Sequence, residues 1–430
     1  MKNMLIKTSG LILLFWIVSA TWANPLFASS TNNGYGVEAD SAQYHTYRGK
    51  VVDKLNNSPL VYADITVEGE NTSTVSNNQG NFVIKISKKS KAKAIIISHL
   101  GYKNLVFPIS QLKPRHNLLR VEPAAVALNQ VYVRPGPTEQ IIKKVLENIK
   151  ANYPQKPNQM TGFYREFIKK RNNYVSLSEA IVGIYKAPYK SLLNDQVRII
   201  KGRKGNNVKR MDTLLFKLQG GPATGLLLDI VKNPYVLLNS DMLLKYKFNL
   251  INEIKKNNRI YYVIQFEPIS KIGVPRYSGK YYIDVRTYAL ASADFYLKLD
   301  QPEAAAQLFI KKKPSGAKVT PTSAHYFVNY HEQNGKWYFN YAKGEVAFKI
   351  KWKKRLFSSV YSTSFEMAIT DRKDQNVVRF KPSERFKQRQ IFSETVQAFS
   401  KQDYWGKYNY IEPNQSIERA LRKFRRILKK

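Results

Sequence analysis

The sequence has 430 residues, with 70 lysines and arginines against 31 aspartates and glutamates, so its formal net charge is +39 at pH 7. A hydrophobic share of 43% is that of a folded protein, and the length suits about two or three domains. There is no cysteine, which excludes disulfides, thiolate metal sites, cysteine nucleophiles and the lipidated cysteine of bacterial lipoproteins.

Residues 1–23 have the pattern of a signal peptide. A lysine-containing start is followed by the apolar run "LILLFWIVSA" at residues 11–20, and cleavage is expected after Ala20 or Ala23. An apolar run of this length is too short to cross a bilayer, which needs about 20 residues. We therefore expect an exported protein of the periplasm or the outer-membrane periphery, which is not a lipoprotein.

The large positive charge predicts an anionic partner. Nucleic acid is the usual partner of so basic a chain, but the export signal predicts that none is bound. The polyanions of a bacterial envelope are lipid phosphates, lipopolysaccharide and acidic glycans. The alternative is a solvated lysine-rich surface without a specific partner.

Residues 24–44 are rich in asparagine, serine and glycine without periodicity, and we expect a flexible leader. Residues 45–122 then alternate apolar and polar side chains in short runs, such as Ile65 with Val67 and Phe82 with Ile84. Several short strands separated by turns every few residues predict an antiparallel β-sandwich.

The segments "GKVVDKLNNSPLVYADITVEG", "TVSNNQGNFVIKI" and "IIISHLGYKN" occur in this order within residues 45–122. They resemble the carboxypeptidase-like regulatory domain, a transthyretin-like β-sandwich. The resemblance implies an envelope protein of Bacteroidota, in which such domains often precede a second domain. The turn at residues 77–80 lacks the acidic residue that members often carry there, which puts a calcium site at this turn in doubt.

Residues 123–137 read as an extended linker that ends in two prolines. The stretch "TEQIIKKVLENIKANYP" then predicts a helix that begins near Thr138, ends at Pro154 and carries one apolar stripe. Two strands are expected on either side of Asn172 and Asn173.

From residue 244 onward the pattern predicts consecutive hairpins. The segment "EVAFKIKW" places Val346, Phe348, Ile350 and Trp352 on an inner face, and the pair Asn334-Gly335 suits a two-residue hairpin turn. We expect residues 138–430 to form a larger α+β domain on an antiparallel meander, which could curve into a half-barrel. The fold class as a whole is mainly β with some α.

The motifs "TGFYRE", "GKYYIDVRTYAL" and "DYWGKYNYIEPNQSIERAL" are similar, in this order, to an uncharacterised strand-rich family of Bacteroidota whose members carry the same sandwich. More loosely, "SGKYYIDVRTYAL" resembles the half-barrels of periplasmic lipoprotein carriers. That resemblance implies a curved sheet able to shelter an acyl chain or an apolar peptide.

Residues 416–430 predict a basic amphipathic helix that begins at Ser416. Its apolar face is expected to dock on the large sheet or, alternatively, to lie on a membrane. Its polar face supplies the candidate residues for binding an anionic surface, which are Arg419, Arg422, Lys423, Arg425 and Arg426.

Catalytic motifs are missing. A zinc carboxypeptidase needs a histidine and a glutamate three residues apart, and no histidine of the chain has a glutamate at that spacing. There is no HExxH motif, no GxSxG nucleophile elbow and no Walker phosphate loop. We therefore expect no metal, no cofactor and no catalytic residue.

Two pairs of carboxylates are the remaining catalytic candidates, because two acids suffice for glycoside hydrolysis. Glu166 and Glu179 lie on neighbouring predicted strands with Arg165 close by, and Asp284 and Asp294 form a similar pair. Acids beside arginines on strands are more often ion pairs that tether the fold.

The sequence thus predicts a non-catalytic exported envelope protein with an adaptor or binding role. Its partner is expected to be an envelope protein or an anionic lipid or glycan surface, with peripheral membrane contact. The alternatives are a periplasmic carrier for an acyl chain or apolar peptide and, third, an unrecognised hydrolase.

Overall fold

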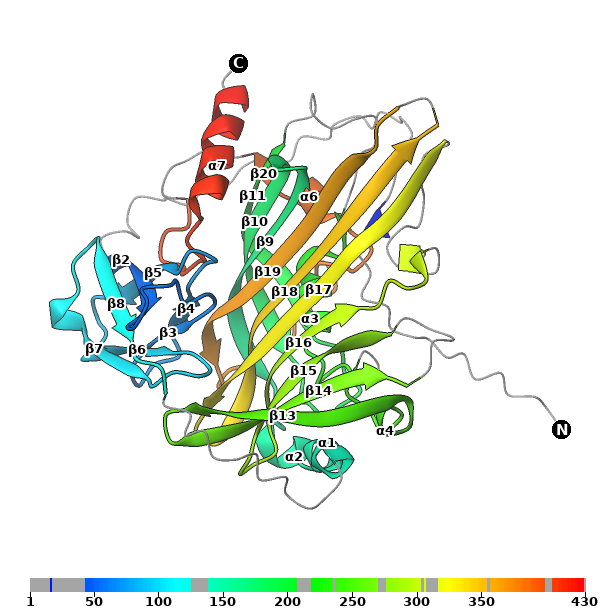
Figure 1. Ribbon diagram of the computed structural model, residues 1–430. Coiled ribbons are helices and arrows are strands. Elements are labelled where there is room, and N and C mark those ends of the chain that lie inside the picture. Colours follow the sequence, from blue (N-terminus) through cyan, green and yellow to red (C-terminus); the bar gives the residue numbers. More distant parts are fainter. Residues whose placement is uncertain are drawn as a thin grey trace.

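The computed structural model describes Trp16–Ile17 and residues 43–124, 138–206, 218–234, 237–269, 276–302, 305–306, 316–353, 356–398 and 404–428. The protein is mainly β, with a small sandwich beside a much larger sheet (Figure 1). Most of the predicted signal peptide, leader and linker falls outside the described residues. The short strand β1 (Trp16–Ile17) pairs with β12 (Leu218–Gln219).

The sandwich is built from two sheets, with strand orders β5-β2-β8 and β4-β3-β6-β7. Its core lies between the two sheets and consists mainly of aliphatic side chains, together with Phe82. Val51, Ile65, Phe82 and Ile95 are fully buried. The elements are β2 (Tyr44–Asp53), β3 (Asp64–Val67), β4 (Ser73–Val75), β5 (Asn81–Ser87), β6 (Ala94–Ser98), β7 (Leu105–Pro108), the 3-10 helix η2 (Ile109–Gln111) and β8 (Asn117–Val121).

The turn before β5 is organised by Asn77. The Oδ1 atom of Asn77 accepts hydrogen bonds from the backbone N–H groups of Gln79 at 2.8 Å and Asn81 at 3.0 Å. Gly80 has a φ of +77°, and a Cβ atom there would lie 2.5 Å from the carbonyl oxygen of Val51. The turn thus depends on the side chain of Asn77, which accepts backbone hydrogen bonds, and on Gly80, which has a positive φ and no Cβ atom.

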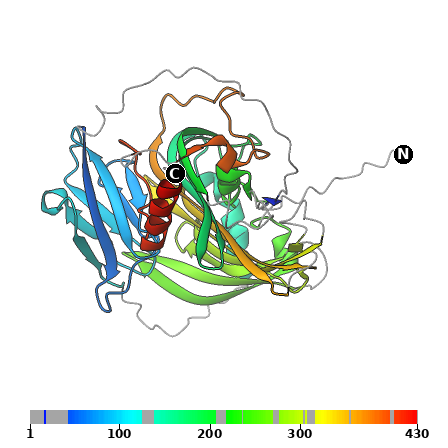
Figure 2. The same cartoon turned by 90° about the horizontal axis from the view of Figure 1, so that it is seen from above.

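The larger sheet has eleven strands in the order β13-β14-β15-β16-β17-β18-β19-β9-β10-β11-β20, all antiparallel except the last pair. Strand β19 thus pairs with β9, which lies about 200 residues earlier in the sequence. The sheet as a whole twists and curves strongly (Figures 1 and 2). Its strands are β9 (Asn158–Lys170), β10 (Asn173–Lys186), β11 (Gln196–Asn206), β13 (Tyr246–Lys256), β14 (Arg259–Pro268), β15 (Tyr277–Asp284), β16 (Leu290–Leu297), β17 (Ala317–Gln333), β18 (Lys336–Trp352), β19 (Ser359–Lys373) and β20 (Gln397–Ala398).

One face of this sheet, here called the helix face, is packed against short helices. Side chains such as Phe266, Tyr281 and Phe295 point into this core and are fully buried. The helices are α1 (Thr138–Glu147), α2 (Ile149–Asn152), α3 (Gly221–Leu227), α4 (Met242–Lys245) and α6 (Phe392–Thr395). The single helix predicted from Thr138 is interrupted at Asn148, which separates α1 from α2.

The opposite face, here called the sandwich face, is covered by the sandwich, the segment 404–414 and the C-terminal helix α7 (Gln415–Leu428) (Figure 2). Side chains of the sandwich donate hydrogen bonds to backbone carbonyl groups of β19 and of the segment 404–414. Asn71 donates to the carbonyl of Arg372 at 2.7 Å, and Thr74 donates to the carbonyl of Tyr410 at 3.1 Å. The sandwich is therefore held on the sheet by directional hydrogen bonds as well as by apolar packing.

The predicted fold class is confirmed. Val346, Phe348 and Ile350 are buried, and the turn between β17 and β18 has positive φ angles of 52° at Asn334 and 75° at Gly335. None of the helices in the described part of the chain is long and apolar enough to span a membrane.

Candidate functional site

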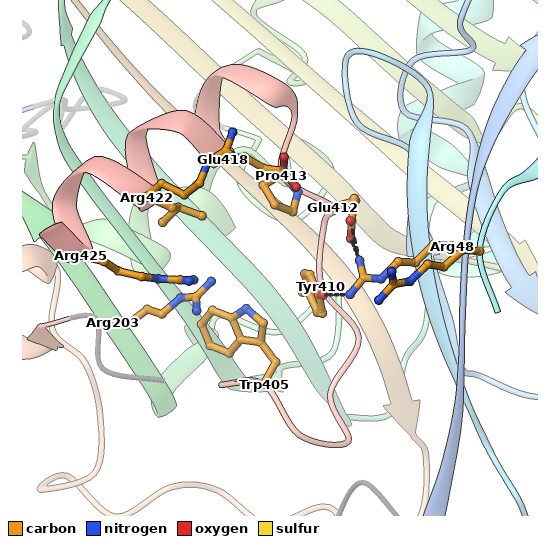
Figure 3. Close-up of a pocket in the computed structure, with 11 residues that line it drawn as sticks. Arg48, Arg203, Trp405, Tyr410, Glu412, Pro413, Glu418, Arg422 and Arg425 are labelled. Carbon is orange, nitrogen blue, oxygen red and sulfur yellow. Dashed lines mark hydrogen bonds and ion pairs between the residues drawn. The ribbon is translucent and has the colours of Figure 1, made fainter. Parts of the chain in front are cut away.

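A cleft of about 660 Å³ lies where the sandwich, the segment 404–414, strand β11 and helix α7 meet (Figure 3). We call it the arginine cleft, because five arginines line it, namely Arg48, Arg115, Arg203, Arg422 and Arg425. The other lining residues are Trp405, Tyr410, Glu412, Pro413, Glu418 and Leu421.

Helix α7 reaches this cleft because its apolar side docks on the sheet. Ile417, Leu421 and Phe424 are buried and pack in one cluster with Tyr174 and Leu177 of β10. This contact favours the docking alternative over the membrane alternative for the apolar face of the helix. The basic face of the helix is left on the outside.

The helix begins with a cap from Asn414, not from the predicted Ser416. The Oδ1 atom of Asn414 accepts hydrogen bonds from the backbone N–H of Ile417 at 2.9 Å and from the hydroxyl of Ser416 at 2.7 Å. Asparagine is among the strongest N-cap residues, because its short side chain reaches the free N–H groups of the first turn. Asn414 also donates to Oδ1 of Asn78 at 2.8 Å, which ties the start of α7 to the sandwich.

With α7 docked on the sheet, the five predicted candidate residues fall into two groups, those that line the arginine cleft and those that do not. Arg422 and Arg425 line the arginine cleft. Arg419, Lys423 and Arg426 are exposed and do not line it. Their role in binding an anionic surface stays a prediction for all five.

Arg48 enters the cleft from β2 of the sandwich. Its guanidinium forms an ion pair with Glu412 and donates a hydrogen bond to the hydroxyl of Tyr410 at 2.9 Å (Figure 3). Burial opposes the charged form of Arg48, but Tyr410 and Glu412 together raise its pKa. Burial also raises the pKa of the Glu412 carboxyl, against the attraction of Arg48.

Arg203 enters from β11 and belongs to a buried network. Both of its contacts with Glu179 are short, at 2.8 Å from Nε and 2.7 Å from Nη2 to Oε2. Glu179 also accepts from Nε of Arg165 at 2.7 Å, and Arg165 donates to Oε1 of Glu366 at 2.8 Å. Burial opposes the charge of Glu179, but Arg203 and Arg165 lower its pKa, so the carboxylate stays ionised.

Trp405 forms part of the cleft wall and is almost fully buried. Its ring lies under the guanidinium of Arg203, with 4.6 Å between the guanidinium carbon and the ring centroid. Its indole Nε1–H is buried and makes no hydrogen bond to any group in the described part of the chain. An unsatisfied buried donor is uncommon in folded proteins, and here it lies in the wall of a basic cleft.

The charges of the arginine cleft are unbalanced. Its acidic lining residues are Glu412, which pairs with Arg48, and Glu418. Arg115, Arg422 and Arg425 have no carboxylate within ion-pair distance among the residues that the structure describes, and Arg203 and Arg425 point into the cleft from opposite elements (Figure 3). Planar guanidinium groups bind carboxylates and phosphates with paired hydrogen bonds, so the arrangement is suited to an anionic ligand.

The two predicted carboxylate pairs are not brought together as catalytic pairs. Glu166 points to the helix face, where Tyr164 donates to it at 2.9 Å, whereas Glu179 lies on the sandwich face with Arg165. The expectation of a tethering ion pair thus fits Glu179. Asp284 accepts from the backbone N–H of Thr287 at 2.8 Å, and Asp294 pairs with His325 at 2.6 Å.

The described histidines, aspartates and glutamates contain no group of three that could hold a metal ion. Burial raises the pKa of Glu166 to about 8, yet this carboxyl is enclosed by the core and does not line the arginine cleft. What the cleft offers is a set of positive charges and hydrogen-bond donors, of which Arg48 and Arg203 are held in place by ion pairs.

Sequence reasoning missed Arg48, Arg115, Arg203 and Trp405 as parts of a site. Nothing in the local pattern of β2 or β11 marks these residues, because strand arginines beside polar residues usually face solvent. The available signal was "DYWGKYNY", a segment between elements that is rich in aromatic residues.

The folds on either side of the cleft can be compared with known proteins. Residues 47–133 match the family model of the CarboxypepD_reg-like domain, to which the sandwich is therefore similar. No curated protein matches the chain.

Three solved structures are similar to part of the chain at low identity. A LolA superfamily protein from Nitrosomonas europaea shares 13% identity, with a TM-score of 0.19 and coverage of 57% of this chain and 98% of that one. A DUF1329 family protein from Desulfovibrio piger shares 10%, with a TM-score of 0.26 and coverage of 57% and 98%. The Pseudomonas aeruginosa MucA/MucB complex shares 12%, with a TM-score of 0.17 and coverage of 53% and 92%.

Proposed function

We propose that this protein is a non-catalytic envelope protein that binds an anionic envelope component through the arginine cleft. The observation that carries the proposal is the convergence of five arginines, from the sandwich, from β11 and from α7, on one cleft of about 660 Å³. The signal-peptide pattern at residues 1–23 supports a location in the periplasm or at the outer-membrane periphery.

The group that enters the cleft is a phosphate or carboxylate carried by a larger molecule. Arg115, Arg422 and Arg425 supply positive charge that carboxylates of the described residues do not neutralise, and Arg48 and Arg203 are held in place by Glu412 and Glu179. Prearranged arginines bind such groups with less ordering of side chains than flexible surface residues need.

The exposed basic side chains of α7 extend this positive field beyond the cleft. Arg419, Lys423 and Arg426 would then contact neighbouring charges of a membrane or glycan surface, each contributing about 1 kcal/mol near an anionic bilayer. Because the apolar side of α7 is buried on β10, contact with a membrane would be electrostatic and peripheral, without insertion of the helix.

The carrier alternative rests on the curved sheet. The helix face of that sheet is filled by side chains such as Phe266, Tyr281 and Phe295. The third alternative, a hydrolase, needs two carboxylates at one site, and the pairs named from the sequence lie apart. Binding at the arginine cleft is therefore the function that the geometry supports best.

The proposal is tested by co-sedimentation of the purified chain with lipid vesicles. We expect binding to vesicles that contain phosphatidylglycerol and much weaker binding to vesicles of phosphatidylcholine alone. Raising the salt concentration should release the bound protein, because the contacts at a charged surface are screened. Equal binding to both kinds of vesicle, or none to either, would contradict the proposal.

A further inference from the structure

A second cleft, of about 480 Å³, lies between the sandwich and the sandwich face of the large sheet. We call it the aromatic cleft, because its walls carry Tyr62 of the sandwich with Tyr261, Tyr282, Phe327 and Trp337 of the sheet. The rings are fixed by one another. Tyr62 lies 5.9 Å from Phe327, and Tyr261 meets Trp337 edge to face at 6.4 Å between ring centroids.

Polar side chains of the aromatic cleft interact with one another in pairs. Asp294 contacts His325 at 2.6 Å, and Lys343 contacts Glu345 at 2.9 Å. Lys343 also donates to the hydroxyl of Tyr62 at 2.7 Å. The acids of the lining, Asp64, Asp294 and Glu345, stand against the lysines Lys256 and Lys343, so the cleft lacks the excess of positive charge found in the arginine cleft.

A third pair lies deeper, where Lys256 faces Asp64. Burial lowers the pKa of Lys256 and raises the pKa of Asp64, whose Oδ1 accepts a hydrogen bond from Asn340 at 2.5 Å. Within the described part of the chain, Nζ of Lys256 donates no hydrogen bond to another group. Lys256 is half-buried and lines the cleft, so its amino group is accessible to a ligand that offers hydrogen-bonding groups.

The aromatic cleft continues into a neighbouring hollow of about 470 Å³, which shares Lys256, Tyr261 and Trp337 with it. This hollow also contains Asn104, whose buried Oδ1 atom accepts no hydrogen bond from the described residues. The two hollows border each other across these shared residues and both carry polar groups, so we treat them as one groove. Such a groove suits an extended ligand with many donors and acceptors.

Both acyl chains and saccharides bind between aromatic side chains, and the polar groups of the lining favour one of these two ligand classes over the other. An acyl chain would remove water from Asp294, His325 and Glu345 without offering hydrogen bonds, which is unfavourable for polar groups. A saccharide places its apolar ring face on an aromatic side chain while its hydroxyls replace the displaced water. The balanced charge of the lining disfavours an acidic sugar.

We infer that the aromatic cleft binds a neutral oligosaccharide, with a sugar ring on Tyr282 and hydroxyl groups on the pairs around Asp294 and Lys256. This site is separate from the arginine cleft. The sandwich thereby contributes one wall of a glycan-binding groove, in addition to holding Arg48 and the start of α7.

The test uses isothermal titration of the purified chain with maltotetraose, cellotetraose and tri-N-acetylchitotriose. We expect at least one of them to bind with a Kd of about 1 mM or lower. Tyr282→Ala should weaken this affinity by about tenfold, and Asp294→Asn should weaken it as well. Tyr282 is half-buried and belongs to none of the core clusters, so its substitution is expected to leave the fold intact.

Phe357→Ala is the matched control, because Phe357 is an exposed aromatic residue outside the cleft, and it should leave the affinity unchanged. The double variant Arg422→Glu with Arg425→Glu should also retain saccharide binding, which separates this inference from the proposed function. The inference is overturned if none of the three sugars binds, or if binding survives both Tyr282→Ala and Asp294→Asn. It is equally overturned if lauric acid binds in the cleft and the sugars do not.

Discussion

Arg165 and Glu179 are both buried and lie opposite each other on β9 and β10, with 2.7 Å between Nε of the arginine and Oε1 of the glutamate. Arg165 also donates to the carbonyl of Ile411 at 2.9 Å, and Glu179 continues to Arg203 in the arginine cleft. This ion pair therefore links the large sheet to the segment 404–414 and to the cleft that we propose as the binding site.

Removing the charge of Glu179 should destabilise the protein strongly. In Glu179→Gln, the guanidinium groups of Arg165 and Arg203 stay buried beside a neutral amide, and we expect the free energy of unfolding to fall by about 3–5 kcal/mol. Urea denaturation followed by circular dichroism measures this change. Lys103→Ala, which removes an exposed ion pair with Glu122, is the control and should have little effect. Equal effects of the two substitutions would contradict the role given to Glu179.

The pairing of Arg165 with Glu179 could be predicted only in part. The two strands around Asn172 were evident from the alternation, and their hairpin starts with Asn173 opposite Lys170. Continued without a break, that register would place Arg165 opposite Ser178. A bulge at Val175 shifts the register by one residue, so that Glu179 meets Arg165 and lies on the face opposite to that of Glu166.

Glu166 gives a second prediction, on the pH dependence of stability. Burial raises its pKa in the folded protein from the ordinary 4.5 to about 8. Between these two values the folded state holds a proton that the unfolded state has lost, so stability falls as the pH rises through this window. The loss is of the order of 5 kcal/mol above pH 8.

Glu166→Gln removes this titration and keeps an acceptor for the hydroxyl of Tyr164. We expect the variant to have a higher Tm than the wild type at pH 8 and a similar Tm at pH 4, measured by differential scanning calorimetry. Glu253→Gln, at an exposed position, is the control and should leave both values unchanged. A Tm difference that does not depend on pH would argue against a buried neutral carboxyl at Glu166.

The third prediction concerns the docking of α7. Phe424 is 1% exposed and packs in one cluster with Tyr174 and Leu177. Phe424→Ala should loosen the helix, because the core substitution of a phenylalanine by alanine costs about 3–5 kcal/mol. Limited trypsin digestion should then cut the helix at its arginines much faster than in the wild type. Lys423→Ala, on the exposed side, should not accelerate cleavage at the remaining sites, and unchanged cleavage in Phe424→Ala would show that the helix is not docked.

The helix and the sandwich were predictable because their signals are local. The amphipathic pattern of residues 416–430 gave the helix, and the alternation within residues 45–122 gave the strands. The arginine cleft was not predictable, because it needs β19 to close onto β9 and the segment 404–414 to pass over β9–β11. Contacts at such sequence separation leave no periodicity in any one segment, and Arg48 and Arg203 are ordinary strand residues until the topology brings them together.

The most direct test of the arginine cleft uses a small soluble anion, so that no planar surface contributes. Glycerol phosphate is titrated into the wild type, the cleft variant Arg422→Glu with Arg425→Glu, and the control variant Arg419→Glu with Arg426→Glu. Both variants carry the same change of charge on the same helix. Our account predicts binding to the wild type and the control variant, with a loss of at least about tenfold in the cleft variant. No binding to the wild type, or the same loss in both variants, would contradict it.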